Sequence, residues 1–172
     1  FLVGLADDIF SFRPNTKLVV QIGLASVLLF FGYRLDWTES LTVSSVLTVL
    51  WVVGITNAFN LLDNMDGLCA GIAIICTGTL LFGLSPIDET STLATTAIVL
   101  ASLLGSVAGF LVYNFHPASI FMGDSGSMFI GFMLSALTLQ PGHAETTSGS
   151  LLSIVAAPVL LLLVPIFDTT FV

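Results

Sequence analysis

Positive charge is almost absent from this sequence. Its 172 residues include three lysines and arginines against eleven aspartates and glutamates, which gives a formal net charge of -8. Proteins that bind nucleic acids carry clusters of Lys and Arg, so the composition argues against a nucleic-acid partner. Charge of either sign is scarce at 8% of residues, whereas soluble domains carry about 25%. An ordinary soluble domain is therefore excluded.

Cysteine is also rare. Cys69 and Cys76 lie in one apolar run, on one helical face and without the CxxC spacing of redox or metal sites. We interpret both as small core residues. No repeat, low-complexity segment or Pro/Ser-rich linker divides the chain, so we expect one domain.

Apolar residues take the place of charge, at 56% of the chain. They form runs near the roughly 17 to 25 residues that a helix needs to cross a bilayer, without the alternation of membrane strands. The predicted fold is an all-α, polytopic transmembrane helical bundle with about six complete crossings. The fifth run is short enough to be a re-entrant or tilted buried segment instead. The runs are 18–31, 41–55, 67–84, 93–112, 127–140 and 151–167.

An even number of crossings separates the acidic positions, which places them on one side of the membrane. The polar loops 34–40, 88–89 and 141–150 fall on the other side. Arg13 and Lys17 lie on the acidic side and Arg34 on the other, a small positive-inside bias toward a cytoplasmic acidic face. So many carboxylates on one face predict a cation among them. The acidic positions are Asp7, Asp8, Asp63, Asp66, Asp124 and Asp168.

The first acidic pair ends an apolar helix. Adjacent helical residues point about 100° apart, so Asp7 and Asp8 cannot serve one point equally. We expect one to face a ligand and the other to support it. The alternative is an ordinary hydrophilic loop at the water interface.

Amides and carboxylates alternate at the second patch. Asn57, Asn60 and Asn64 recur at i, i+3 and i+7, with Asp63 and Asp66 at adjoining positions, which predicts a polar stripe on a helix. Such groups are costly inside a membrane unless they are paired, so the stripe is expected to face a cavity, a substrate or a metal. The structural alternative is a strip that joins two helices and ends at a glycine turn.

Glycines flank the third acidic position, Asp124. Gly123 and Gly126 permit a tight backbone with accessible N–H groups, and Ser125 and Ser127 are expected to cap the following helix. This arrangement suits a metal with a diphosphate. The alternative is that Asp124 is itself a helix cap.

Two further side chains are candidates for support. His116, beside Pro117, is either a proton donor or a solvated interfacial histidine. Asp168 is either a supporting carboxylate or an ordinary residue at a helix end.

Four motifs in order, GLADD with RPxTK, NAFNLLDNMDGL, NFHPASIFMGDSGS and PIFDTT, resemble the polyprenyl-phosphate N-acetylhexosamine-1-phosphate transferases of the glycosyltransferase 4 group. The resemblance covers nearly the whole chain. It implies that a UDP-N-acetylhexosamine donates its sugar 1-phosphate to undecaprenyl phosphate, with Mg2+ (Mn2+ as an alternative), and that UMP is released. The product would initiate cell-envelope polysaccharides such as teichoic acid or lipopolysaccharide.

The resemblance also implies residue roles. Asp124 would be the metal ligand, and Asp7 would activate the lipid phosphate with support from Asp8. Asp63 and Asp66 would contact the metal or the nucleotide, and Phe121 would stack on uracil. Asn57, Asn60 and His116 complete the expected substrate-binding set. Family members usually have Gly in place of Asn64, and their His-rich loop would follow Val172.

The expected protein is thus one integral-membrane catalytic domain over residues 1–172, truncated at both ends and inactive alone. It would lie in the bacterial inner membrane with a cytoplasmic active face, and a homodimer stays an open alternative. Within the family, the alternative is the phospho-N-acetylmuramoyl-pentapeptide transferase, the lipid I synthase. The alternative from another class is an ion-coupled transporter, which is disfavoured because the carboxylates lie at the ends of the apolar runs.

Overall fold

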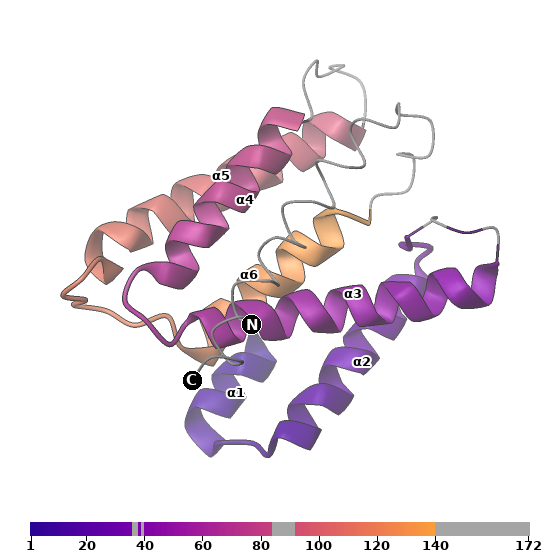
Figure 1. The fold of residues 1–172 in the computed structure, drawn as a ribbon, viewed down its shortest axis with the longest axis horizontal. Helices are drawn as coiled ribbons and strands as arrows, with labels where there is room; N and C mark the ends of the chain where they lie inside the picture. The colour runs from indigo at the N-terminus through magenta and orange to yellow at the C-terminus, as the bar shows by residue number, and fades with distance from the viewer. Residues whose placement is uncertain (36–37, 39, 84–91, 140–172) are drawn as a thin grey trace, which may run out of the picture. The chain divides into compact units, whose positions relative to one another are not determined.

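The computed structural model describes residues 1–35, 38, 40–83 and 92–139 (Figure 1). Within these ranges the regular structure is six helices and no strand, which confirms the all-α prediction. The helices are α1 (Leu2–Phe10), α2 (Pro14–Phe30), α3 (Leu41–Leu62), α4 (Leu68–Gly83), α5 (Thr92–Asn114) and α6 (Gly123–Leu137).

The chain divides into two compact units. Among the described residues, the first unit comprises those of 1–61 and 122–139 and holds α1, α2, nearly all of α3, and α6. The second comprises the described residues of 62–121 and holds α4 and α5. Each unit is described by itself.

Glycines allow close backbone contacts in the first unit. A Cβ added to Gly4 of α1 would lie 2.4 Å from the carbonyl oxygen of Asp124, at the start of α6. A Cβ on Gly131 of α6 would lie 2.8 Å from the Cα of Thr56 in α3. Small residues at such positions let helices approach closely. Helix α6 is therefore packed against α1 at its beginning and approaches α3 closely at Gly131.

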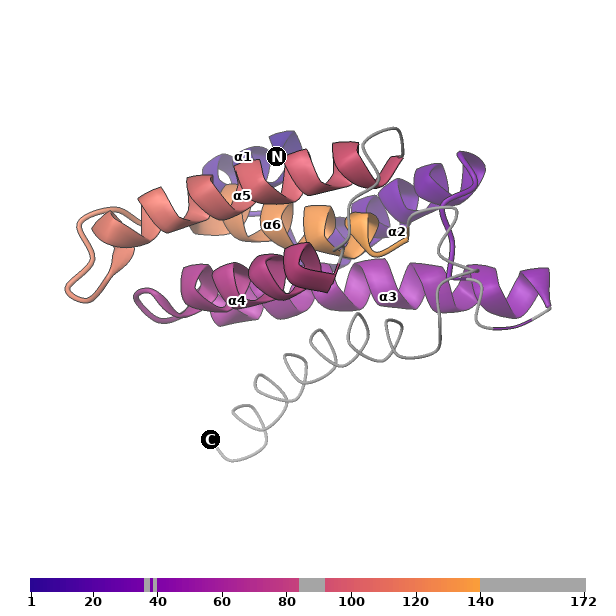
Figure 2. The ribbon, with the colours of Figure 1, turned by 90° about the horizontal axis from the view of Figure 1, so that it is seen from above.

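The second unit is a hairpin of α4 and α5, which run alongside each other in opposite directions (Figures 1 and 2). Cys69, Ala73 and Cys76 of α4 are buried, as are Leu100 and Val107 of α5. The interpretation of both cysteines as core residues is confirmed.

Two described helices are long and apolar enough to cross a membrane, namely Leu41–Leu62 and the Ala94–Asn114 part of α5. Two shorter helices, Pro14–Phe30 and Leu68–Gly83, are also apolar. The count of six crossings stays a prediction. The run 151–167, Asp168, and the loops 88–89 and 141–150 lie outside the described residues.

The predicted helical stripe through Asn64 is wrong. Helix α3 extends beyond the apolar run to Leu62 and ends there, so Asp63, Asn64 and Asp66 lie in the turn before α4. Asp and Asn favour turns because their short side chains bond to nearby backbone groups. Gly67 completes the turn with a φ of +73°, a conformation that glycine adopts without steric cost.

Candidate functional site

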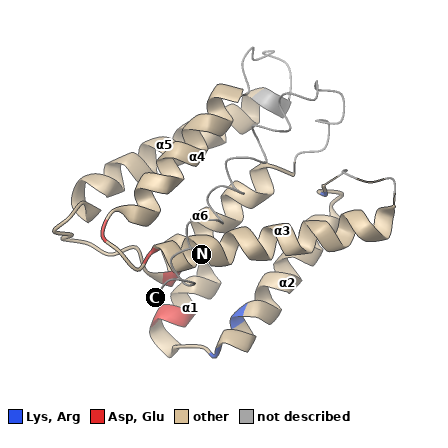
Figure 3. Ribbon diagram, viewed as in Figure 1, with Lys and Arg blue, Asp and Glu red and all other residues tan. Residues whose placement is uncertain are grey.

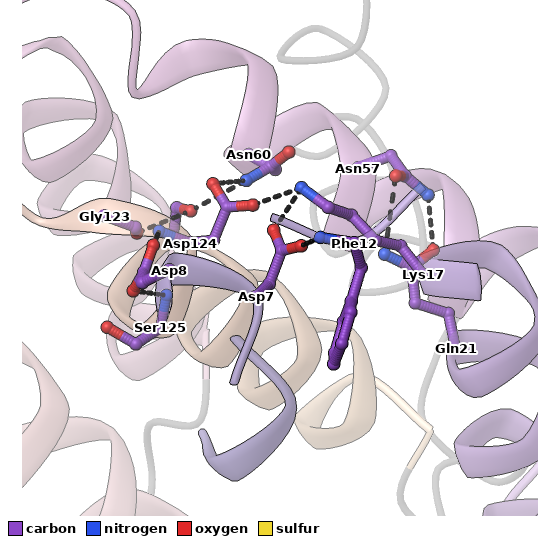
Figure 4. A network of polar contacts seen from close by, with 11 residues as sticks. Asp7, Asp8, Phe12, Lys17, Gln21, Asn57, Asn60, Gly123, Asp124 and Ser125 are labelled. Atoms are coloured by element: carbon purple, nitrogen blue, oxygen red, sulfur yellow. Dashed lines mark hydrogen bonds and ion pairs between the residues drawn. The ribbon is translucent and has the colours of Figure 1, made fainter. Parts of the chain in front are cut away.

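One lysine joins two acidic side chains in the first unit. The Lys17 ammonium contacts both the Asp7 and the Asp124 carboxylates through their Oδ2 atoms (Figure 4). These residues come from α2, α1 and α6. The cluster is thus built from segments more than a hundred residues apart, since Lys17 and Asp124 are separated by 107 positions.

The turn between α1 and α2 positions Asp7 and Lys17. Ser11 ends α1 in the left-handed conformation, with a φ of 51°, and its N–H donates to the carbonyl oxygen of Asp7 at 2.7 Å. The next N–H, of Phe12, donates to Asp7 Oδ1 at 2.7 Å. Pro14 then begins α2, where its fixed φ suits the first helical position. Lys17 follows within the first turn of α2 and points back toward Asp7 (Figure 4).

Asp8 contacts the backbone of α6 instead of the lysine. Its Oδ1 accepts a hydrogen bond from the Asp124 N–H at 2.8 Å, and its Oδ2 accepts one from the Ser125 N–H at 3.0 Å. The two carboxylates of the pair therefore point to different partners, as their helical spacing requires. Gly123, with a φ of +65°, turns the chain into α6, and a Cβ there would lie 3.0 Å from Asp8 Oδ2.

The expectation that Ser125 and Ser127 cap α6 is wrong. Both lie inside the helix, and the Ser127 hydroxyl donates to the carbonyl oxygen of Gly123 at 3.0 Å. Asp124 is not the cap either, since it belongs to the first turn of α6. The carboxylate of Asp8 satisfies the first N–H groups because α1 packs against this end of the helix.

The side-chain amide of Asn60 holds the other oxygen of Asp124. Its Nδ2 donates to Asp124 Oδ1 at 2.8 Å and lies 3.2 Å from the Ser127 hydroxyl oxygen. One turn earlier in α3, Asn57 is paired with Gln21 of α2: Asn57 Nδ2 donates to Gln21 Oε1 at 2.6 Å. Asn60 thus belongs to the acidic cluster, while Asn57 joins α3 to α2 beside it.

The Asp7 carboxyl is buried, with 5% of the residue exposed. Burial raises its pKa, but the hydrogen bonds from the Lys17 ammonium and the Phe12 N–H outweigh this effect and hold the pKa below its usual range. Asp7 is therefore ionised at neutral pH. Figure 3 shows the acidic end of α1 and the basic start of α2 as neighbouring coloured segments.

The second unit has its own polar cluster, around Asp66. Asp66 Oδ2 lies 3.0 Å from His116 Nδ1 and accepts a hydrogen bond from the Ala118 N–H at 3.1 Å. The Ala118 N–H and then His116 lower the pKa of Asp66. Asn114 adds a second link across this loop, because its Oδ1 accepts from the Gly67 N–H at 3.0 Å and its Nδ2 donates to the Ile120 carbonyl at 2.9 Å.

These contacts hold the loop after α5 onto the turn before α4 and leave two side chains accessible. The side chain of His116 is 81% exposed, and Phe121 is 78% exposed. The histidine is thus oriented through Nδ1 while most of its ring is open to solvent.

The structure brings together part of the expected site. The residues gathered in the first unit are Asp7, Asp8, Asn60 and Asp124, with Asn57 beside them. Those in the second unit are Asp63, Asp66, His116 and Phe121. Among the described residues, no three His, Cys, Asp or Glu side chains gather closely enough to hold a metal ion by themselves.

Reasoning from sequence missed Lys17 and Gln21 as members of the site, and it missed the cap formed by Asp8. One signal was available for the lysine. It is the only lysine in a chain that has eleven acidic residues and only two other basic ones, and it follows Pro14 by less than one helical turn.

Comparison with known proteins identifies the chain's relatives. A family model described as glycosyl transferase family 4 matches residues 1–142. A protein of Bacillus subtilis named "Probable undecaprenyl-phosphate N-acetylglucosaminyl 1-phosphate transferase" is 41% identical over 99% of this chain and 48% of its own length. A "Decaprenyl-phosphate N-acetylglucosaminephosphotransferase" of Mycobacterium leprae is 37% identical over 78% of this chain and 37% of its own length. A "Phospho-N-acetylmuramoyl-pentapeptide-transferase" of Prochlorococcus marinus is 33% identical over 86% of this chain and 47% of its own length.

The chain spans about half the length, or less, of these curated relatives. The matched segment includes α1 with its acidic pair, the Asp66 turn and all of α6. The resemblance drawn from the four motifs is confirmed, and the chain belongs to glycosyl transferase family 4.

Proposed function

We propose that the protein transfers an N-acetylhexosamine 1-phosphate from a UDP-sugar to undecaprenyl phosphate at the cytoplasmic face of the bacterial plasma membrane, with release of UMP. The reaction would begin the synthesis of a cell-envelope polysaccharide. Membership of the family favours this transferase over an ion-coupled transporter. The observation that carries the proposal is that Asp7 and Asp124 converge on one cation position. This position lies at the start of α6, which begins within the GDSGS part of the third motif.

A divalent metal is part of the proposal. Mg2+ prefers hard oxygen ligands and is usually held by one or two carboxylates together with substrate phosphates. Asp7 and Asp124 fit this requirement, because their Oδ2 atoms are already close enough to share the Lys17 ammonium. We assign Asp124 as the metal ligand, with Asp7 beside it and Asp63 as a further candidate. When bound, the metal would neutralise charge on the diphosphate.

The chain's residues then act chiefly by positioning. In the proposed direct route, a phosphate oxygen of the lipid would attack the sugar-bearing phosphorus of the donor while the bond to the oxygen of UMP breaks, so one phosphoanhydride replaces another. The alternative is a two-step route through a covalent Asp–phosphosugar. Little covalent work is needed, and orientation with charge stabilisation supplies most of the rate. Asp7, held ionised, would accept the proton of the lipid phosphate. Asp8 would support it by fixing the start of α6.

The polar loop of the second unit would serve the nucleotide. Phe121 is exposed and can stack on uracil, and His116 is oriented by Asp66 with most of its ring accessible. We assign this loop to substrate binding. Asn57 and Asn60 of the first unit are likewise proposed as substrate-binding residues.

Asp124→Asn tests the proposal. UMP release from a UDP-N-acetylhexosamine with undecaprenyl phosphate is measured in detergent across a Mg2+ series, with the complete gene product as wild type and as variant. Asparagine keeps the shape and an acceptor for Asn60 but removes the charge that would hold the metal. We expect the variant to fold and to lose transfer by orders of magnitude, with partial recovery at high Mg2+ at most. Wild-type rate and wild-type Mg2+ dependence in the variant would falsify the metal assignment.

The sugar is proposed to be N-acetylglucosamine. The Bacillus relative named for that sugar is 41% identical over nearly the whole chain, against 33% for the phospho-N-acetylmuramoyl-pentapeptide transferase. The latter activity is the second candidate. Parallel assays with UDP-N-acetylglucosamine and UDP-N-acetylmuramoyl-pentapeptide separate the two, because UMP should appear with the first donor alone.

A further inference from the structure

The four carboxylate oxygens of Asp7 and Asp124 have two kinds of partner. Each Oδ1 is held by a neutral donor of the protein, the Phe12 N–H at 2.7 Å for Asp7 and the Asn60 amide at 2.8 Å for Asp124. Each Oδ2 contacts the same ammonium, that of Lys17 (Figure 4). The neutral donors fix the orientation of both carboxylates. The two Oδ2 atoms therefore form a seat for one cation, and the lysine fills it.

Lys17 is not a solvated surface lysine at this seat. Its side chain is 24% exposed, and the side chains of its two partners are 4% exposed for Asp7 and 27% exposed for Asp124. Two carboxylates contact the one ammonium, and a third, that of Asp8, is bound to the Asp124 and Ser125 N–H groups beside them, so the cluster carries more negative than positive charge. A divalent ion would balance that charge better than a single ammonium does.

A metal at the Oδ2 atoms and the ammonium exclude one another. Mg2+ and Mn2+ need oxygen ligands at about 2 Å. An ammonium in contact with the same oxygens would place two positive centres within a few ångströms. Lysine can move away because its charge is carried on a flexible four-carbon stem. The donors to the Oδ1 atoms are uncharged and can stay in place.

We propose that Lys17 is a tethered counter-ion that occupies the divalent-cation seat between Asp7 and Asp124 and is displaced when the metal binds. This inference rests on the proposed function, which supplies the metal. The displaced ammonium becomes a donor for a phosphate oxygen, for which lysine acts as a point charge. Metal binding and phosphate binding are thereby coupled. A phosphate that binds the ammonium draws it out of the seat and so favours metal binding, and a metal that binds first releases the ammonium and so favours phosphate binding.

The inference predicts the sign of a change in metal affinity. A residue that helps to hold the metal or the phosphate would leave metal binding unchanged or weaken it when it is removed. A residue that competes for the seat strengthens metal binding when it is removed. Because the competing charge is in contact with the ligands, the gain should be about tenfold or more.

Mn2+ alone serves as the probe. It is titrated into the purified complete gene product in detergent, and the free Mn2+ concentration is measured by electron paramagnetic resonance to give the dissociation constant. Lys17→Met, which keeps the length of the side chain without its charge, should bind Mn2+ about tenfold or more tightly than wild type. Lys17→Arg keeps the charge and should stay near the wild-type affinity. Arg13→Gln is the matched control, because it removes an exposed positive charge from the same turn; its effect should be less than about threefold.

Unchanged or weaker Mn2+ binding in Lys17→Met overturns the inference. It is also overturned if the tighter binding survives in the double variant Lys17→Met with Asp124→Asn, because the ion then sits elsewhere. Should Lys17→Met fail to fold, Lys17→Gln carries the same expectation, since glutamine keeps a neutral donor for the carboxylates. The assay needs no substrate. A failure of the proposed transfer reaction is therefore seen separately, as the absence of UMP release by wild type.

Discussion

Asp8 caps the helix that carries Asp124. Its two carboxylate oxygens accept hydrogen bonds from the N–H groups of Asp124 and Ser125, at 2.8 and 3.0 Å. Helix α1 thus supplies the side-chain cap that α6 lacks in its own sequence. A carboxylate at this place satisfies free N–H groups and opposes the positive end of the helix dipole. The position of Asp124 is thereby set by a neighbour of Asp7.

The cap predicts a specific loss of stability. Asp8→Ala should lower the free energy of unfolding by about 0.5–2 kcal/mol, as removal of a helix cap does, and Asp8→Asn should cost less because asparagine keeps one acceptor. Thermal unfolding in detergent measures both changes. Ser125→Ala is the control, because the cap uses the backbone of that residue and should survive. Equal stability of Asp8→Ala and wild type would show that water replaces the carboxylate at no cost.

The contact between α1 and α6 leaves no room for a side chain at Gly4. A Cβ there would lie 2.4 Å from the Asp124 carbonyl oxygen and 2.5 Å from the Ser125 Cα, and both are backbone atoms. Gly4→Ala should therefore destabilise the protein by about 1–3 kcal/mol and reduce transfer by displacing Asp124. Gly23→Ala in α2 is the matched control, since a Cβ there meets nothing within 4 Å. It should be neutral or stabilising by up to about 1 kcal/mol. Similar unfolding temperatures for the two variants would contradict the close approach.

The Asp66 cluster predicts a pH-dependent contribution to stability. Hydrogen bonds from the Ala118 N–H and then from His116 lower the pKa of Asp66. Its contribution is fully present above the unfolded pKa of about 3.9 and is lost as the pH falls through the lower folded pKa. The difference in unfolding stability between wild type and Asp66→Asn should thus hold above about pH 4 and shrink below it.

His116→Gln provides the control for this experiment. It leaves the Ala118 N–H, the larger cause of the lowered pKa, in place. The acid-dependent difference should therefore persist in that background, in unfolding curves recorded from about pH 2.5 to 7. A difference that disappears with the histidine would assign the effect to His116 instead.

The prediction that the acidic residues lie on one side of the membrane is testable by cysteine labelling. Single cysteines at Ser11 and Ser125, in a background with Cys69→Ala and Cys76→Ala, should react with an impermeant maleimide from the same side of the membrane. Cysteines at Glu89 or Glu145, outside the described residues, should react from the other side. Opposite-side labelling of Ser11 and Ser125 would end the model of a shared site. Labelling of each cysteine is compared between right-side-out and inside-out membrane vesicles, because the impermeant reagent reaches only the outer surface of each.

Composition and hydrophobic runs were sufficient to predict the helical class, because burial in lipid forces the backbone to satisfy its own hydrogen bonds. The divergent directions of Asp7 and Asp8 also followed from helical spacing. The end of α3 at Leu62 was not predicted, because the helical spacing of the asparagines continues through Asn64. The chain instead turns after Leu62, where Gly67 has a positive φ and its N–H donates to the Asn114 side chain. The roles of Lys17 and Asp8 were missed because both depend on segments distant in sequence.

The order in which the cluster can form follows from its distances along the chain. Asp7 and Lys17 are made almost together, whereas Asp124 follows Asp8 by 116 positions. At the usual pace of synthesis, about 5–20 residues per second, this separation amounts to roughly 6 to 23 seconds. During that interval Lys17, ten positions from Asp7, is already present on the nascent chain as its counter-charge. The segment that forms α1 and α2 thus carries a neutralising partner for Asp7 before the helix that completes the cluster has been translated.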